Sequence, residues 1–177
     1  MTNYTILSFD ELTSTSDLLK EHFSSFSHFT MIKTNYQTKG RGQFDRTWIS
    51  NKNENLLFSI LLKDLSVNDI EYLKDWIVNG LFKLLTDYQM QPVFKEPNDI
   101  YVNDKKICGI LFETRTQNDQ LVYAVIGIGL NVCQTEFNEL NATSMHNVLN
   151  QQLKTDEVFD KLVKILLTSY QVQKKML

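Results

Sequence analysis

Asn55-Leu-Leu-Phe-Ser-Ile-Leu-Leu62 is apolar at six of its eight positions. A strand with one face in water alternates apolar and polar residues, whereas a strand covered on both faces is almost continuously apolar. This stretch therefore predicts a strand in the centre of a sheet, with further structure packed on both of its faces.

Two long helices are predicted on the C-terminal side of this strand. The first runs from Ser66 to Tyr88, with Ser66 and Asp69 placed like a capping box and an apolar residue at each helical repeat: Ile70, Leu73, Ile77, Leu81, Leu84, Leu85 and Tyr88. The second begins at Thr155 with acidic residues in its first turn and buries Phe159, Leu162, Val163, Leu166, Leu167 and Tyr170.

The rest of the chain predicts more strands and one short helix. A strand at residues 4–9 precedes hydroxyl residues that can cap a helix bearing Leu19, His22, Phe23 and Phe26 on one face. Further strands are predicted at 29–35, 93–95, 100–102, 106–113 and 121–128, with tight turns at Asn103-Asp104 and Asn118-Asp119. This order predicts one α+β domain over residues 1–177, with a mixed, largely antiparallel sheet and helices mainly on one face.

The composition is that of an ordinary globular protein, with 42% hydrophobic and 22% charged residues. A net charge of −3 argues against a broad basic face for binding duplex DNA. The sequence has no apolar run long enough to cross a membrane and no secretion signal at its start, so we expect a cytoplasmic protein. Its two cysteines and three histidines are scattered, which favours neither a disulfide framework nor a metal centre.

A long polar loop is predicted between residues 36 and 48. Its Gly40-Arg41-Gly42 core offers backbone amides free of side-chain bulk, flanked by Lys39 and Arg46, and such a nest suits phosphate oxygens. A surface turn with scattered basic residues is the alternative. Trp48 at the end of the loop is a candidate stacking platform, or else a core residue beside Phe44.

A second polar segment runs from Lys95 to Glu113. In Lys95-Glu-Pro-Asn-Asp99 the proline fixes the backbone and the Asn and Asp side chains can bind backbone amides, so a structural turn and a site explain it equally. Lys106 begins the following apolar strand and is a candidate site residue or one more exposed lysine. Gly109 within that strand predicts either close approach of a ligand or a β-bulge.

Three segments, Lys39 to Trp48, Lys95 to Glu113 and Gly127-Ile-Gly-Leu-Asn131, together resemble the catalytic domain of the biotin protein ligases in order and approximate spacing. The resemblance runs from Ser14 into the last helix and implies the fold shared with class II aminoacyl-tRNA synthetases. It also leads us to expect a catalytic domain without the N-terminal DNA-binding and C-terminal domains that many of these ligases carry, and hence no direct operator binding.

The resemblance also implies roles for individual residues. Lys106, Arg41 and Arg46 would be catalytic. The biotin site would comprise Ser14, Thr15, Gln37, Gly40, Arg41, Lys106 and Gly109. The ATP and adenylate site would comprise Gln43, Trp48, Lys95, Asn98, Asp99 and Asn131, with no direct metal ligand and Asp99 assisting Mg²⁺ through water. The hydroxyls of Ser14 and Thr15 can cap a helix at the same time.

Three positions depart from the family pattern. Gln43 stands where a second arginine is usual, Glu96 replaces a tryptophan, and Ser16 replaces an asparagine. Glutamine donates hydrogen bonds but brings no charge, so we expect weaker stabilisation of phosphate and either slow turnover or loss of the activated intermediate. Glu96 adds negative charge near the expected path of the triphosphate.

The implied activity is ATP-dependent formation of biotinyl-5′-AMP, followed by transfer of biotin to a lysine of a biotin carboxyl carrier domain. One alternative is a lipoate or octanoate ligase or transferase on the same fold, although its glycine-rich and histidine-bearing signatures are missing. The other is a non-catalytic or weakly active binder of biotin or biotinyl-AMP with a regulatory role. Family members often dimerise, so a homodimer is also expected.

Overall fold

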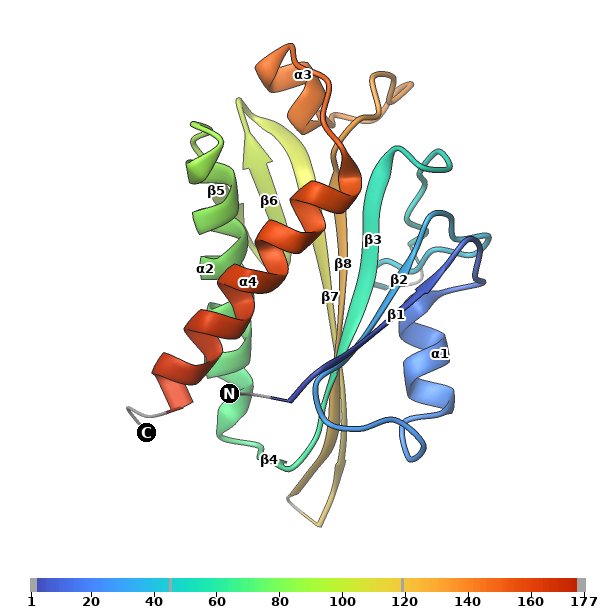
Figure 1. The fold of residues 1–177 in the computed structure, drawn as a ribbon, viewed down its shortest axis with the longest axis vertical. Coiled ribbons are helices and arrows are strands. Elements are labelled where there is room, and N and C mark those ends of the chain that lie inside the picture. The colour runs from blue at the N-terminus through green and yellow to red at the C-terminus, as the bar shows by residue number, and fades with distance from the viewer. Residues whose placement is uncertain (1–2, 45, 119, 175–177) are drawn as a thin grey trace.

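The core of the molecule is a twisted sheet (Figure 1). The computed structural model describes residues 3–44, 46–118 and 120–174. Within this part the sheet has eight strands in the order β1-β2-β3-β8-β7-β6-β5, with β4 also paired to β8. The strands are β1 (Thr5–Phe9), β2 (Thr30–Thr34), β3 (Asn55–Leu62), β4 (Leu65–Ser66), β5 (Val93–Lys95), β6 (Asp99–Val102), β7 (Lys105–Gln117) and β8 (Gln120–Asn131). Only β1 and β2 are parallel among these pairs, which confirms the predicted mixed, largely antiparallel sheet.

Strand β3 lies near the middle of the sheet, between β2 and β8, and all eight of its residues are buried. Leu56, Phe58, Ile60 and Leu62 belong to the large core under the long helices. Leu61 belongs to a smaller core on the opposite face. The continuous apolar run therefore reflects burial on both faces, as predicted.

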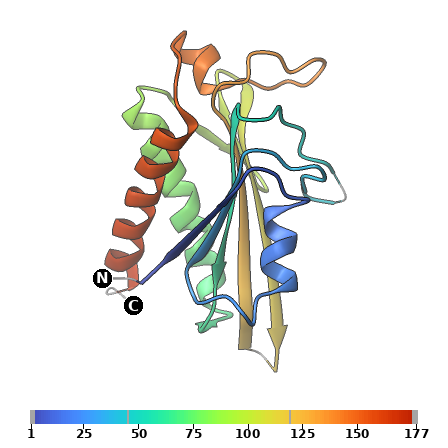
Figure 2. The same cartoon turned by 45° about the vertical axis from the view of Figure 1, so that its right-hand side comes forward.

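Helices cover both faces unequally (Figure 2). Helices α2 (Asp69–Asp87) and α4 (Thr155–Lys174) pack together on one face, where the Trp76 indole N–H donates to the Leu166 carbonyl at 3.0 Å. The short α1 (Thr15–Glu21) lies on the other face. Its Leu19 packs with Ile32 of β2 and Val125 of β8. The prediction of helices mainly on one face is confirmed.

Several predicted boundaries are wrong. Helix α1 ends at Glu21, so His22, Phe23 and Phe26 lie beyond it. Helix α2 starts at Asp69 because Ser66 belongs to β4, although the Ser66 amide still donates to the Asp69 carboxylate at 2.7 Å. Strands β7 and β8 are longer than expected, and the two-residue β4 and the short α3 (Met145–Leu149) were not predicted.

The predicted turn between β6 and β7 is confirmed, since Asn103 and Asp104 have positive φ values of 51° and 59°. Of the second predicted turn, Asn118 also has a positive φ, of 50°, whereas Asp119 lies outside the described residues. Cys108 and Cys133 are free thiols, and burial raises the pKa of both. No helix in the described chain is sufficiently long and apolar to cross a membrane.

Candidate functional site

A cavity of about 370 Å³ opens on the α1 side of β7 and β8. Three glycines lie along its floor. In the β7–β8 register Gly109 pairs with Gly129, and Gly127 pairs with Leu111. A Cβ atom on Gly127 would lie 2.7 Å from the Ser16 hydroxyl. The glycines on these strands thus leave room for neighbouring side chains to approach the backbone at the bottom of the pocket.

The Trp48 indole lies directly on this floor. A Cβ on Gly129 would be 2.5 Å from Trp48 Cε2, and one on Gly109 would be 2.8 Å from Trp48 Cζ3. The Lys106 ammonium lies 5.5 Å from the centre of the indole ring. Trp48 is therefore half-buried on a glycine platform, neither fully solvent-facing nor part of a core with Phe44, which is 80% exposed.

The end of the cavity next to α1 holds a row of hydroxyl groups. The amide and the hydroxyl of Thr15 both donate to Gln37 Oε1, at 2.8 and 3.1 Å. Ser59 Oγ lies 2.7 Å from the Thr15 hydroxyl and 2.9 Å from that of Ser16. Ser14 caps α1 by accepting from the Asp17 amide at 3.3 Å. It also lines the cavity, so capping the helix does not remove it from the site.

The direction of this hydrogen-bonded row is fixed by its first member. Thr15 has one hydroxyl hydrogen and gives it to Gln37, so Ser59 must donate to Thr15. Ser16 must then donate to Ser59. Lone pairs on Ser16 and the amide hydrogens on Gln37 Nε2 remain for a ligand, so the row presents an acceptor at one of its ends and donors at the other.

The loop between Gly40 and Trp48 folds back on itself over the cavity. The Gly42 amide donates to the Arg46 carbonyl at 2.7 Å, and the Trp48 amide donates to the Gly40 carbonyl at 3.0 Å. A Cβ on Gly40 would lie 2.4 Å from the Trp48 carbonyl oxygen, so this close approach requires glycine. Gly40 thereby shapes the loop, but it does not line the cavity itself.

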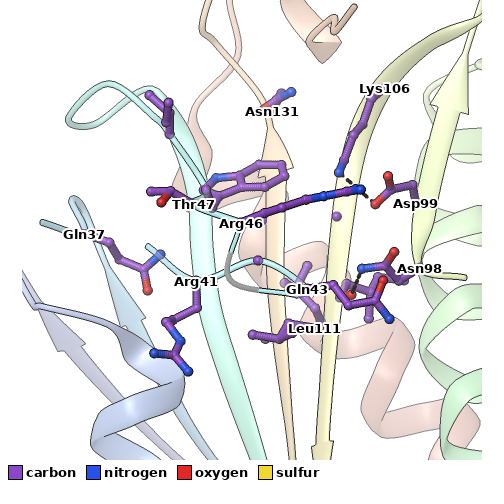
Figure 3. Close-up of a pocket in the computed structure, with 18 of the residues that line it drawn as sticks. Gln37, Arg41, Gln43, Arg46, Thr47, Asn98, Asp99, Lys106, Leu111 and Asn131 are labelled. Atoms are coloured by element: carbon purple, nitrogen blue, oxygen red, sulfur yellow. Dashed lines mark hydrogen bonds and ion pairs between the residues drawn. The ribbon is translucent and has the colours of Figure 1, made fainter. Parts of the chain in front are cut away.

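The two loop arginines point in different directions (Figure 3). Arg46 extends toward Lys106 and Asp99, whereas Arg41 points toward α1, where its Nε lies 3.9 Å from the Asp17 carboxylate. Gln43 lies on the side of Asn98. Of the two, Arg46 is the one whose charge is directed to the lysine end of the cavity.

Lys106 and Asp99 form an ion pair at the end of the cavity opposite the hydroxyl row, with 2.8 Å between Nζ and Oδ1. The Lys106 backbone is held by the loop that precedes α3, since its amide donates to the Asn141 carbonyl and its carbonyl accepts from the Thr143 amide. The Asn98 side chain, just before β6, donates to the Ile110 carbonyl of β7 at 2.8 Å. Asn131 is buried and donates to the Thr143 carbonyl at 3.0 Å.

Most of the predicted site residues meet in this one cavity. Its lining includes Ser14, Thr15, Gln37, Arg41, Gln43, Arg46, Trp48, Asn98, Asp99, Lys106, Gly109 and Asn131. Lys95 does not line it; its ammonium lies 4.0 Å from the centre of the ring of Tyr101, which does. Glu96 is exposed and borders a separate groove beside α2.

Residues that the sequence did not identify as site residues also line the cavity, including Ser16, Ser59, Gly127 and Gly129. Ser59 is the one hydroxyl residue in the apolar run of β3, and that signal could have identified it. The described residues contain no group of three or more His, Cys, Asp or Glu side chains arranged to hold a metal ion.

Comparison with protein families matches residues 8–131 to the Biotin/lipoate A/B protein ligase family. This chain belongs to that family. The matched range covers the hydroxyl row, the loop between Gly40 and Trp48 (the glycine loop), Lys106 and Asn131. It therefore includes both ends of the cavity.

Curated relatives of this family match part of the chain. The bifunctional ligase/repressor BirA of Bacillus subtilis is 32% identical over 107 residues, which cover 59% of this chain and 33% of BirA. Biotin–protein ligase 2 of Arabidopsis thaliana is 30% identical over 166 residues, covering 86% of this chain and 49% of that protein. The chain thus spans about a third to a half of the length of these relatives.

Solved structures show the same fold. The biotin protein ligase from Aquifex aeolicus in complex with biotin and ATP matches with a TM-score of 0.74 and 28% identity, covering 93% of this chain and 69% of that one. A biotin protein ligase-like protein of unknown function from Silicibacter sp. TM1040 has a TM-score of 0.74 at 9% identity, covering 97% of this chain and 72% of that one. The shared fold therefore also occurs in a protein whose function is not known.

Proposed function

We propose that this chain is a biotin protein ligase domain that activates biotin with ATP. The biotin carboxylate attacks the α-phosphorus, the bond to pyrophosphate breaks, and biotinyl-5′-AMP forms. An acceptor lysine amine then attacks the acyl carbon, and AMP leaves. Catalysis of this kind requires positioning and charge stabilisation, with no nucleophile from the protein.

One observation carries this proposal: a single cavity has a row of neutral hydrogen-bonding groups at one end and cationic side chains at the other. Thr15, Ser16 and Ser59 supply the neutral end, whereas Lys106 and Arg46 supply the cationic end. A ligand with a polar neutral head and a carboxylate tail fits this polarity. Negative charge that develops on phosphorus oxygens would be stabilised at the lysine end.

The neutral end favours a cyclic urea over the dithiolane ring of lipoate. A urea has a carbonyl acceptor between two N–H donors, which complements the donors of Gln37 Nε2 and the lone pairs of Ser16. A dithiolane ring offers no N–H donor and only weak sulfur acceptors. The hydroxyl row therefore supports biotin as the substrate.

Changing Ser59 to alanine is expected to weaken biotin binding about three- to tenfold, because it breaks the row between Thr15 and Ser16. Calorimetric titration with biotin and with lipoate measures this loss and the selectivity together. Ser8→Ala, on the exposed side of β1, makes the same chemical change outside the cavity and should leave affinity unchanged. Equal affinity of the unmodified chain for lipoate and biotin would contradict the substrate assignment.

The cationic end suits a nucleotide. Trp48, seated on its glycines, offers a flat surface for adenine, and Asn131 lies close to it in the same cavity as a hydrogen-bonding side chain. Asp99 is a carboxylate beside the expected phosphate position. Mg²⁺ keeps several waters, so the nucleotide phosphates would hold it with Asp99 assisting through water, and it would neutralise phosphate charge.

Gln43 favours a second candidate function, a weakly active binder of biotin or its adenylate. It lines the cavity where the family pattern has arginine, and a neutral amide stabilises phosphate less than a guanidinium. Gln43→Arg is therefore expected to raise the rate of adenylation about fivefold, or to slow release of the adenylate by a similar factor. Quenched-flow measurement of biotinyl-5′-AMP, free and bound, separates these two effects, and no change in either would show that Gln43 does not limit the reaction.

The carrier-domain acceptor, the homodimer, the lack of direct DNA binding and the cytoplasmic location stay predictions from the sequence. The acceptor is the most accessible to test, because transfer leaves biotin covalently attached to a lysine.

A further inference from the structure

Four side chains of alternating charge connect β7, α1 and the glycine loop. Lys20 Nζ lies 2.7 Å from Glu113 Oε1 on β7 and 3.0 Å from Asp17 Oδ1. Asp17 Oδ1 in turn lies 3.9 Å from Arg41 Nε. The series crosses from the sheet, over the helix, to the loop that covers the cavity.

Asp17 is the fixed point of this series. Its amide is held by the Ser14 hydroxyl at the start of α1, and its carboxylate faces the Lys20 ammonium. Burial alone would lower the pKa of Lys20, but its bonds to Glu113 and Asp17 outweigh burial and raise it, so the ammonium stays charged. The Ser14 hydroxyl and the Lys20 ammonium therefore both restrain Asp17, and its carboxylate faces Arg41 from a fixed position.

The position of Arg41 is coupled to that of Trp48 through the backbone of the loop. Arg41 bridges to Thr47 across the loop, and the Gly40 carbonyl accepts the Trp48 amide. A displacement of Arg41 would therefore move the loop segment that carries the indole. The loop that carries Trp48 is linked in this way to the helix that carries Thr15 and Ser16.

We propose that Asp17 is a positioning residue that ties the glycine loop to α1 through Arg41 and so holds Trp48 on its glycine platform. Any effect of this ion pair on catalysis rests on the proposed function, whereas its effect on the position of the loop does not. It acts in the unliganded chain and can be measured there.

Hydrogen exchange of the Gly42 and Trp48 amides tests the tie, because both amides donate within the loop. In Asp17→Asn their exchange is expected to be roughly two- to fivefold faster than in the unmodified chain, the range for a partly exposed ion pair. Core amides of β3 provide the reference for global stability. Asp156→Asn is the matched control, since Asp156 is also a first-turn aspartate that pairs with a lysine, Lys33, but on α4.

Three further measurements extend the test. Salt at about 1 M shortens the Debye length to about 3 Å, so it should accelerate exchange in the unmodified chain and add little in Asp17→Asn. Arg41→Ala should accelerate the same two amides, and Asp17→Asn should add little further acceleration in that background. Where biotin-dependent activity is present, Asp17→Asn should raise the KM for ATP severalfold and leave kcat within about twofold.

Unchanged loop exchange in Asp17→Asn would overturn the proposal. Acceleration that matches the β3 reference, or that Asp156→Asn reproduces, would also overturn it, because the effect would then be general destabilisation. A chain that never binds biotin would overturn the proposed function alone and leave the exchange result interpretable.

Discussion

Replacing Lys106 with alanine is expected to lower kcat for biotin adenylation about 100- to 1000-fold, the usual cost of removing one preorganised group that stabilises developing charge. Its ammonium is the positive group nearest to Asp99 at the cationic end of the cavity, and Arg46 points to the same place. Steady-state formation of biotinyl-5′-AMP measures the loss. Affinity for biotin should change far less, because the hydroxyl row stays intact.

Lys105 provides the matched control. It is the preceding residue of β7, exposed and outside the cavity lining, so Lys105→Ala should leave kcat unchanged. Because Lys106→Ala also leaves Asp99 without its ion-pair partner, urea unfolding should accompany the assay and separate lost stability from lost catalysis. Near-normal kcat in Lys106→Ala would remove the lysine from the mechanism.

Changing Gly129 to alanine is expected to weaken ATP binding roughly 10- to 100-fold, because the added methyl group must displace the Trp48 indole or strain the strand. Its Cβ would lie 2.5, 2.7 and 2.9 Å from three atoms of the indole ring. Biotin affinity should fall less, since the hydroxyl row lies at the other end of the cavity. Equilibrium titration with a non-hydrolysable ATP analogue measures the change.

A double-mutant cycle shows whether the effect passes through Trp48. In a Trp48→Ala background the methyl group has no indole to displace, so Gly129→Ala should cost little further affinity. Equal losses in both backgrounds would mean that the glycine acts by another route. Tryptophan fluorescence provides a second readout: Trp76 is fully buried in the core, so only the Trp48 signal should change when the nucleotide analogue binds.

Periodicity and apolar runs predicted the layers of the fold. The run of β3 and the helical spacing of α2 and α4 reflect burial, which is a local property of the sequence. The start of α2 was misplaced because Ser66 pairs with β8 as part of β4. Such pairing depends on residues more than 50 positions away and leaves no local signal.

The site was predicted by residue type better than by geometry. The motif resemblance brought Lys106, Gln37 and the glycine loop together, and they do line one cavity. It did not indicate that Arg41 points to Asp17, since that contact depends on the placement of α1 against the loop. Lys95 was assigned to the site from the same motif. It pairs with Asp99 in the β5–β6 register and its ammonium lies over the Tyr101 ring, yet Lys95 itself does not line the cavity.

The seating of Trp48 also required the three-dimensional structure. Gly109 was expected either to allow a ligand to approach the backbone or to mark a β-bulge, and in the structure the Trp48 ring lies against it. Gly109 and Gly129 become neighbours only through the β7–β8 register. The seating of the indole therefore depends on the pairing of β7 with β8, which is not visible in the local sequence.

Biotin-dependent exchange of pyrophosphate into ATP tests the central claim most directly, because it reports reversible adenylation without an acceptor protein. We expect exchange that is absent without biotin, saturates with biotin, and falls to background in Lys106→Ala. Saturable biotin binding with exchange no greater than in Lys106→Ala would contradict an adenylating enzyme and identify the chain as a binder.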